Sequence, residues 1–226
     1  MRSLRFTGAL CAFVVGCASA AVTPTPAPTA APPPPTVAAA APTPAPGAIT
    51  LVLDPAASHA SYRAQEQLVG RNLPSEAVGT SSGVSGAIVL NPDGSLAGDQ
   101  SHIQVDLSKL TSDESRRDNF IKGNTLETRR FPTATFTPKD VEGLPAPLPT
   151  AGDAEFSLSG DLTVHGVTRP VTWQVSVQFN PGGVSGNATT SVNISDFGMT
   201  PPKAGPVLSI QDGLQLELAF SAARHA

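Results

Sequence analysis

Residues 156–179 read FSLSGDLTVHGVTRPVTWQVSVQF, and this stretch decides the fold. Apolar and polar side chains alternate along most of it, which is typical of β-strands with one buried face and one solvated face. The stretch therefore predicts two consecutive strands. Their apolar faces consist of Phe156, Leu158, Leu162 and Val164 in the first strand and Val171, Trp173, Val175, Val177 and Phe179 in the second.

The same alternation recurs on both sides of this stretch. Ile103, Val105 and Leu107 share one face of a strand, and residues 214–220 repeat the pattern near the end. The turn sequence Asn180–Gly183 places Pro and Gly where a hairpin needs them. About nine strands joined by short turns predict an antiparallel sheet. Further strands are predicted at 49–54, 58–66, 84–90, 133–141 and 184–194.

Only one helix is predicted, and it is short. Thr111 followed three residues later by Glu114 forms a capping box, and Gly123 is a stop signal. One such helix cannot cover so large a sheet, so the apolar faces must cover each other in a sandwich or a closed barrel. The predicted fold is all-β, and a barrel of about eight strands has room for side chains or for one small ligand.

The N-terminus has the features of an export signal. Arg2 and Arg5 precede an apolar run from Phe6 to Gly16 that is too short to span a bilayer. A signal peptide is therefore predicted over residues 1–20, and two cleavage sites compete. Cleavage before Cys17, in a sequence resembling a bacterial lipobox, would leave an acylated cysteine, whereas cleavage after Ala20 would release an ordinary secreted chain.

A linker of low complexity follows the signal. Residues 21–48 are rich in Ala, Pro and Thr, with ten Pro between 21 and 47. Such a segment cannot build a core and predicts a disordered, polyproline-like spacer with a reach of roughly 80 Å. A spacer suits a domain tethered to a membrane through Cys17, although it would also suit the leader of a secreted protein. The folded domain is predicted to span 49–226.

Composition excludes several classes of function. Residues 49–226 carry 12 basic and 18 acidic groups, and an acidic domain without a basic stripe argues against nucleic-acid binding. Its lack of Cys excludes disulfide scaffolds and thiol nucleophiles. The four histidines show no metal-ligand spacing, so we expect no metal site. We also expect no cofactor and no enzymatic activity. Gly79–Gly83 matches the G-x-S-x-G of hydrolases, but a strand follows it where that motif requires a helix.

The segment from Arg116 to Arg130 is locally basic. It contains five Arg or Lys residues against Asp118 and Glu127. One interpretation is a solvated helix and loop. The other is a basic rim at the mouth of a cavity, where the planar donors of Arg hold an anionic or polar headgroup.

Several ordered elements together resemble the YceI family of bacterial lipid-binding proteins. The most specific is GDLTVHGVTRPV at 160–171, and the others are LSKL at 107–110 followed by Arg117-Asp118, RFPTATF at 130–136, and Asp196-Phe197-Gly198 with Asp212 downstream. The resemblance covers nearly all of 49–226. It implies an exported, lipocalin-like antiparallel barrel with an apolar channel for a long isoprenoid, quinone-like or fatty ligand, and it implies no catalytic residue.

The sequence departs from the family pattern at three places. Phe120 stands where a histidine commonly follows the Arg-Asp pair, Leu126-Glu127 replaces a Phe-Asp pair, and Ser195 replaces an arginine. These positions fall where a headgroup would be recognised, so the resemblance leaves the headgroup open.

Two hypotheses follow from these observations. The first is a non-enzymatic carrier or sequestering protein for such a lipid, anchored in the cell envelope through Cys17; the sequence leaves a homodimer open. The second is an exported module that binds a protein or glycan through its loops, with a filled barrel as scaffold. For the first, the predicted apolar lining is Ile103, Val105, Phe136, Phe156, Leu158, Trp173, Val175 and Phe179, and the predicted headgroup rim is Arg116, Arg117, Asp118 and Phe120.

Overall fold

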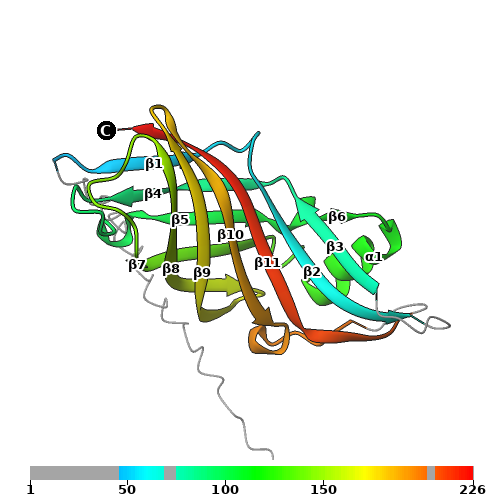
Figure 1. Ribbon diagram of the computed structural model, residues 1–226. Helices are drawn as coiled ribbons and strands as arrows, with labels where there is room; N and C mark the ends of the chain where they lie inside the picture. The colour runs from blue at the N-terminus through cyan, green and yellow to red at the C-terminus, as the bar shows by residue number, and fades with distance from the viewer. Residues whose placement is uncertain (1–45, 69–74, 203–206, 226) are drawn as a thin grey trace, which may run out of the picture. The chain divides into compact units, whose positions relative to one another are not determined.

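Eleven strands pair edge to edge into one antiparallel sheet that closes on itself (Figure 1). The computed structural model describes residues 46–68, 75–202 and 207–225, which all belong to one unit of the chain, Ala40–Ala226. The strands are β1 (Ile49–Leu53), β2 (His59–Leu68), β3 (Ser75–Ser81), β4 (Val84–Leu90), β5 (His102–Asp106), β6 (Thr111–Ser112), β7 (Thr133–Glu142), β8 (Gly152–Val164), β9 (Val167–Asn180), β10 (Gly183–Asn193) and β11 (Val207–His225). The helical segments are η1 (Gly98–Gln100), η2 (Leu107–Lys109), α1 (Ser115–Phe120), η3 (Ile121–Thr125) and η4 (Ser195–Phe197).

The eleven strands occupy eight positions around the barrel. β1 and β2 act as one bent strand, because β11 pairs with both of them along the same edge. β4 and β3 form the next position by pairing with β1 and β2, and β5 and β6 form the third by pairing with β4 and β3. Strands β7 to β11 then follow in chain order. The structure is therefore a closed eight-stranded barrel of lipocalin-like architecture, and the sandwich alternative is excluded.

The long strand β11 closes the ring. It pairs with β10 along one edge, and with β2 and then β1 along the other. Between β1 and β2, residues 54–58 bulge out of the sheet against Ser221. Asp54 N donates to Ser221 O at 2.8 Å and Ser221 N donates to Ser58 Oγ at 3.2 Å, so backbone groups at the bend keep partners.

Inward-pointing side chains of the barrel form one hydrophobic core. On β9, Val175, Val177 and Phe179 are buried while Gln174, Ser176 and Gln178 are exposed, which is the alternation expected from the sequence. The largest fully buried side chain belongs to Phe197, in the η4 turn that covers one end of the barrel. Burial of each such side chain stabilises the fold by about 1.5–3 kcal/mol relative to exposure.

The predicted helix begins later than the capping-box pattern indicated. Thr111 and Ser112 pair with Thr80 and Gly79 of β3, so they are held in a strand. Glu114 is the N-cap and accepts a hydrogen bond from Arg116 N at 3.1 Å, and the helical path continues past Gly123 as η3. Edge pairing with β3 therefore overrides the local helix signal.

Strand β3 is not among the strands predicted from the sequence, which leave residues 67–83 without a strand. Its inward side chains are Ala77, Gly79 and Ser81, all small, so no large apolar residue marks the strand. The space above Gly79 is filled by the ring of Tyr62 from β2, its direct partner across the pair. Residues 70–74 lie outside the described residues.

The predicted signal peptide, Cys17 and the linker up to residue 45 also lie outside the described residues. In the part of the chain that the structure describes, no helix is long and apolar enough to cross a membrane.

Candidate functional site

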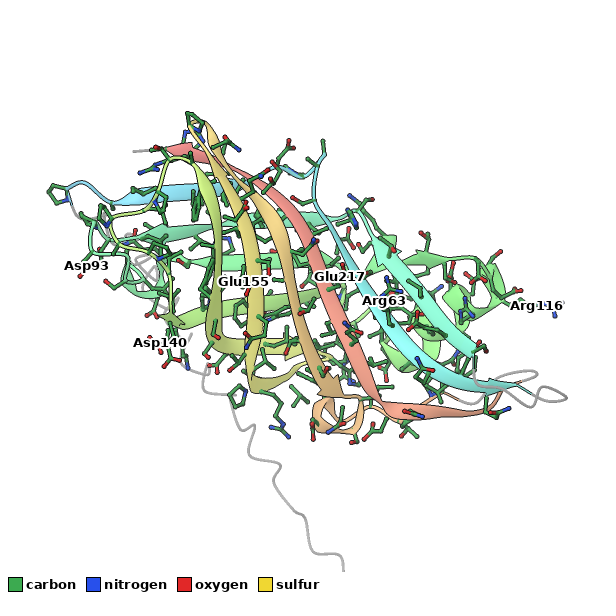
Figure 2. The ribbon with its side chains drawn as sticks, in the orientation of Figure 1. Arg63, Asp93, Arg116, Asp140, Glu155 and Glu217 are labelled. Carbon is green, nitrogen blue, oxygen red and sulfur yellow. The ribbon has the colours of Figure 1, made fainter. Side chains whose placement is uncertain are left out.

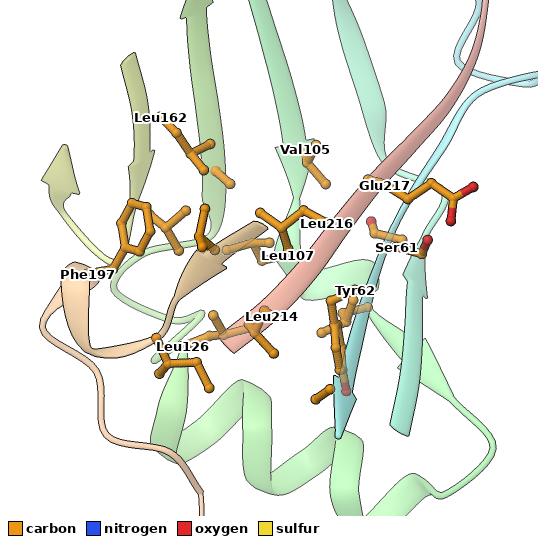
Figure 3. A pocket seen from close by; sticks show the side chains of 18 of the residues that line it. Ser61, Tyr62, Val105, Leu107, Leu126, Leu162, Phe197, Leu214, Leu216 and Glu217 are labelled. Carbon is orange, nitrogen blue, oxygen red and sulfur yellow. The ribbon is translucent and has the colours of Figure 1, made fainter. Parts of the chain in front are cut away.

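The larger of two cavities inside the barrel has a volume of about 200 Å³. It extends from the middle of the barrel, at Phe136, Leu158 and Trp173, to the end covered by η3 and η4. Figure 3 shows Tyr62, Leu126 and other apolar side chains turned toward this common space, while Glu217 points away from it. The labelled apolar wall residues are Val105, Leu107, Leu126, Leu162, Phe197, Leu214 and Leu216.

The smaller cavity has a volume of about 80 Å³ and an entirely apolar wall. It lies among side chains of β1, β4, β5 and β7 to β11. Four residues border both cavities, so the two spaces lie on either side of one layer of side chains. This layer consists of Ile103, Leu158, Ala188 and Leu218. The two cavities together therefore form an interrupted channel through the barrel interior.

All eight apolar residues named from the sequence lie around these cavities. Val105, Phe136 and Trp173 border the larger cavity, Phe156, Val175 and Phe179 border the smaller one, and Ile103 and Leu158 border both. The Phe136 and Trp173 rings meet edge to face with centroids 6.0 Å apart, which fixes the shape of the wall between β7 and β9.

The four predicted rim residues are not brought together at the cavity. Of the four, Arg117 alone lines it. Arg116 is exposed and points away from the barrel (Figure 2), and Phe120 is half-buried outside the cavity wall. Asp118 is buried, where its carboxylate accepts hydrogen bonds from Ser112 N at 3.0 Å and from the Ser112 hydroxyl. Asp118 therefore fixes β6 to α1.

Arg117 is held by acidic and polar neighbours. Its side chain is 18% exposed and pairs with Asp113, while its Nη2 donates to Ser112 Oγ at 3.2 Å. The Glu66 carboxylate, 6% exposed, lies 3.8 Å from Arg117 Nη1 and accepts from Ser75 Oγ. The cation is thus already neutralised inside the protein.

Tyr62 is a site residue that the sequence reasoning did not name. Its ring lines the larger cavity and packs on Gly79, where a Cβ atom would lie only 2.3 Å from Tyr62 Cε1. Burial raises the pKa of Tyr62 to about 12, and the nearby carboxylates add to the effect of burial against the opposing effect of Arg117. The sequence could have indicated Tyr62 as an inward-facing residue, because it alternates with Ala60 and Ala64 on the apolar face of the strand predicted at 58–66.

The η3 and η4 segments that cover one end of the larger cavity were also not predicted in full. Phe197 reaches the cavity from η4, and Gly198 at φ 70° ends this turn in a left-handed conformation. Asp212 holds the turn in place by accepting from Ser195 N at 2.9 Å and from the Ser195 hydroxyl. Ser195, the departure from the family pattern, therefore has a structural role in this chain.

A second contact fastens the η3 side of the cover. His165, in the tight turn between β8 and β9, lies 3.4 Å from Glu127 Oε1 through its Nε2 atom. The His165 ring packs on Phe131 with centroids 4.6 Å apart. Both Glu127 and His165 have positive φ, at 46° and 52°. The packing of His165 on Phe131 ties the segment after η3 to the β8–β9 hairpin, since His165 Nε2 has no hydrogen-bond partner among the described residues.

The hydrolase-like motif does not form a nucleophile site. Ser81 is 1% exposed, and its hydroxyl donates to Asp106 O at 2.6 Å and accepts from Gly83 N at 3.2 Å. It therefore joins β3 to β4 and β5 at the bend. Among the described residues, no group of three His, Cys, Asp or Glu is placed to hold a metal ion.

A closed eight-stranded antiparallel barrel around an apolar interior space has a lipocalin-like architecture. Residues 51–222 match the model of the YceI-like domain. The chain belongs to the YceI family.

Curated relatives and solved structures agree with this assignment. A UPF0312 protein of Pseudomonas putida strain F1 is 36% identical over 115 residues, 46% of this chain and 55% of that protein, so the match spans about half of the relative. A UPF0312 protein of Vibrio vulnificus strain YJ016 is 28% identical over 180 residues, covering 76% and 85% of the two chains.

Two solved structures share the fold at low sequence identity. The polyisoprenoid binding domain from Saccharophagus degradans, described as implicated in plant cell wall breakdown, matches with a TM-score of 0.59 at 16% identity, covering 76% of this chain and 97% of that one. BcnA of Burkholderia cenocepacia matches with a TM-score of 0.56 at 19% identity, covering 77% and 99%.

Proposed function

We propose that this protein binds a long-chain apolar lipid, of the isoprenoid, quinone-like or fatty type, and carries or sequesters it without chemical conversion. The observation that carries this proposal is the apolar interior space of the barrel, in two parts separated by a single layer of side chains. The solved relative described as a polyisoprenoid binding domain supports the same class of ligand.

The energetics of the walls favour a chain-shaped ligand. Each buried CH₂ contributes about 0.8 kcal/mol, so an isoprene unit contributes roughly 3–4 kcal/mol before the cost of ordering the chain. The walls offer few polar groups that would orient a polar molecule. Tight binding therefore depends on the length of chain that the channel accepts.

The alternative, a surface-binding module on a filled barrel, requires an interior occupied by side chains. The cavities of about 200 and 80 Å³ argue against that alternative and for an internal ligand.

The cellular setting is a second part of the proposal. Acylation of Cys17 would hold the protein to a membrane of the cell envelope, and the spacer over 21–48 would let the barrel reach away from the surface. Replacing Cys17 with Ala should release the protein from membrane fractions. A Cys17→Ala protein that still partitions with membranes would exclude this anchor.

The binding proposal is tested by extraction. The full chain is expressed with its own leader, purified without detergent and extracted with organic solvent for mass spectrometry. A near-stoichiometric prenyl or acyl species is expected. An empty extract, with no uptake of farnesol, a quinone or a fatty acid when these are offered, would refute the carrier function.

A further inference from the structure

The end of the larger cavity near α1 holds more negative than positive charge. Arg117 is the one cationic side chain among the described residues that line this cavity. It is paired with Asp113 and lies 3.8 Å from Glu66, and Asp118 is buried one residue further along α1. Two carboxylates, of Glu66 and Asp113, thus lie beside the Arg117 guanidinium, and a third, of Asp118, is held nearby by Ser112, so the charge of Arg117 is more than balanced by its acidic neighbours.

The pKa of Tyr62, which lines the cavity here, indicates that an added negative charge is unfavourable at this end. The pKa of Tyr62 is raised to about 12, first by burial and then by Asp118, Glu66 and Asp113, while Arg117 acts in the opposite direction. The tyrosinate is therefore disfavoured even with the guanidinium nearby. A ligand phosphate in the same place would meet the same burial and the same carboxylates, with the attraction of Arg117 acting against them.

The cavity also contains two neutral polar atoms without a partner in the described part of the chain, one near its covered end at Tyr62 and one in the middle of the barrel at Trp173. Tyr62 Oη and Trp173 Nε1 are buried, and neither has a hydrogen-bond partner among the described residues. Both residues line the larger cavity. A buried polar atom of this kind gains when an uncharged ligand oxygen comes within hydrogen-bond distance.

We infer that the larger cavity selects lipids with an uncharged oxygen headgroup, such as a hydroxyl, phenol or carbonyl, over lipids with a phosphate or diphosphate on the same chain. This inference rests on the proposed carrier function and specifies its ligand class. The headgroup lies at the covered end near Tyr62, and the chain runs past Trp173 and Leu158 toward Phe179.

The test compares farnesol with farnesyl diphosphate, which share one chain and differ only in the headgroup. Trp173 is the only tryptophan of the chain and lines the cavity, so its fluorescence reports binding of both probes directly. With the delipidated full-length protein, we expect farnesol to bind at least about tenfold more tightly than the diphosphate.

Charge variants identify the cause of the preference. The Glu66→Gln, Asp113→Asn double variant removes two of the three carboxylates while keeping side-chain shape, and it should bring the two affinities within about threefold of each other. Asp140→Asn, an exposed change on β7, removes a carboxylate far from α1 (Figure 2) and should leave the preference unchanged. Tyr62→Phe should weaken farnesol several-fold and leave the diphosphate unaffected.

The outcomes separate this inference from the function on which it rests. Diphosphate binding equal to or tighter than farnesol binding would overturn the headgroup preference and leave the carrier function standing. A preference that persists in the double variant would overturn the role of the carboxylates as its electrostatic cause. Failure of both probes to bind, with no uptake of a quinone or a fatty acid, would overturn the carrier function and this inference together.

Discussion

Replacing Leu158 with Ala should join the two cavities, because Leu158 belongs to the layer that borders both. The change removes three carbon atoms from a side chain that is 9% exposed. At about 0.8 kcal/mol per buried CH₂, the lost transfer free energy is about 2.4 kcal/mol. The cavity penalty should be small because Leu158 already borders open space, so the free energy of unfolding should fall by about 3 kcal/mol, near the low end for Leu→Ala.

Leu162→Ala is the matched control for this change. Leu162 lies on the same inward row of β8 and borders only the larger cavity. It should lose a similar free energy of unfolding, measured by urea denaturation with Trp173 fluorescence, without opening the layer. Any difference in ligand binding between the two variants therefore reports on the layer itself.

Chain length is the assay for the joined channel. Geraniol, farnesol and geranylgeraniol differ by one isoprene unit at each step, and their affinities are measured by Trp173 fluorescence. In Leu158→Ala the step from farnesol to geranylgeraniol should gain about tenfold more affinity than in the wild type, after the cost of ordering the longer chain. Equal chain-length profiles for the two Ala variants would refute the idea that Leu158 divides the channel.

Three further predictions concern Tyr62, Gly79 and Asp212. Tyr62 is the only tyrosine, so absorbance at alkaline pH should give a pKa near 12 in the folded protein and near 10 in urea. Because the folded pKa is the higher one, the stabilising contribution is complete below pH 10 and is lost between pH 10 and 12; a folded-state midpoint near 10 would contradict the burial of this hydroxyl. Gly79→Ala should destabilise the fold by about 1–3 kcal/mol, because its Cβ would meet the Tyr62 ring at 2.3 Å, and a Gly79→Ala, Tyr62→Leu double variant should recover part of the loss in urea denaturation. Hydrogen bonds from the side chain and backbone of Ser195 lower the pKa of Asp212, so the stabilising contribution of Asp212 is present above pH 4 and is lost as the pH falls. Ser195→Ala should therefore raise the Asp212 pKa in an NMR titration. An unchanged pKa would argue against these hydrogen bonds in solution.

The long strands in which apolar and polar residues alternate could be predicted, because the apolar residues are the ones that the fold buries. Residues of β8 and β9 alternate in type and in burial alike, and the wall residues Phe136 and Trp173 come from such strands. The shortage of helix to cover the sheet left a sandwich or a closed barrel, and the resemblance to the YceI family implied the barrel. What these elements share is that most of their inward positions carry a large apolar side chain.

The missed features depend on partners distant in the sequence. β3 has a small-residue interior because Tyr62 of β2 fills its space, so the strand is apparent only when both strands are seen together. Thr111 and Ser112 follow a helix-start pattern but pair with β3. Arg117 and Asp118 were expected to act together at a rim, whereas Asp113 neutralises the charge of Arg117 and Ser112 holds the carboxylate of Asp118.

The order of strands around the barrel has a consequence for how the chain reaches this structure. Every pairing joins neighbouring positions along the chain except that of β11 with β1 and β2, which brings the ends of the ring together. Local hairpins can form early, but the ring cannot close until β11 is available. Until then the free edges of β2 and β10 are templates for pairing with other chains, so a chain interrupted before β11 should aggregate rather than form a smaller barrel.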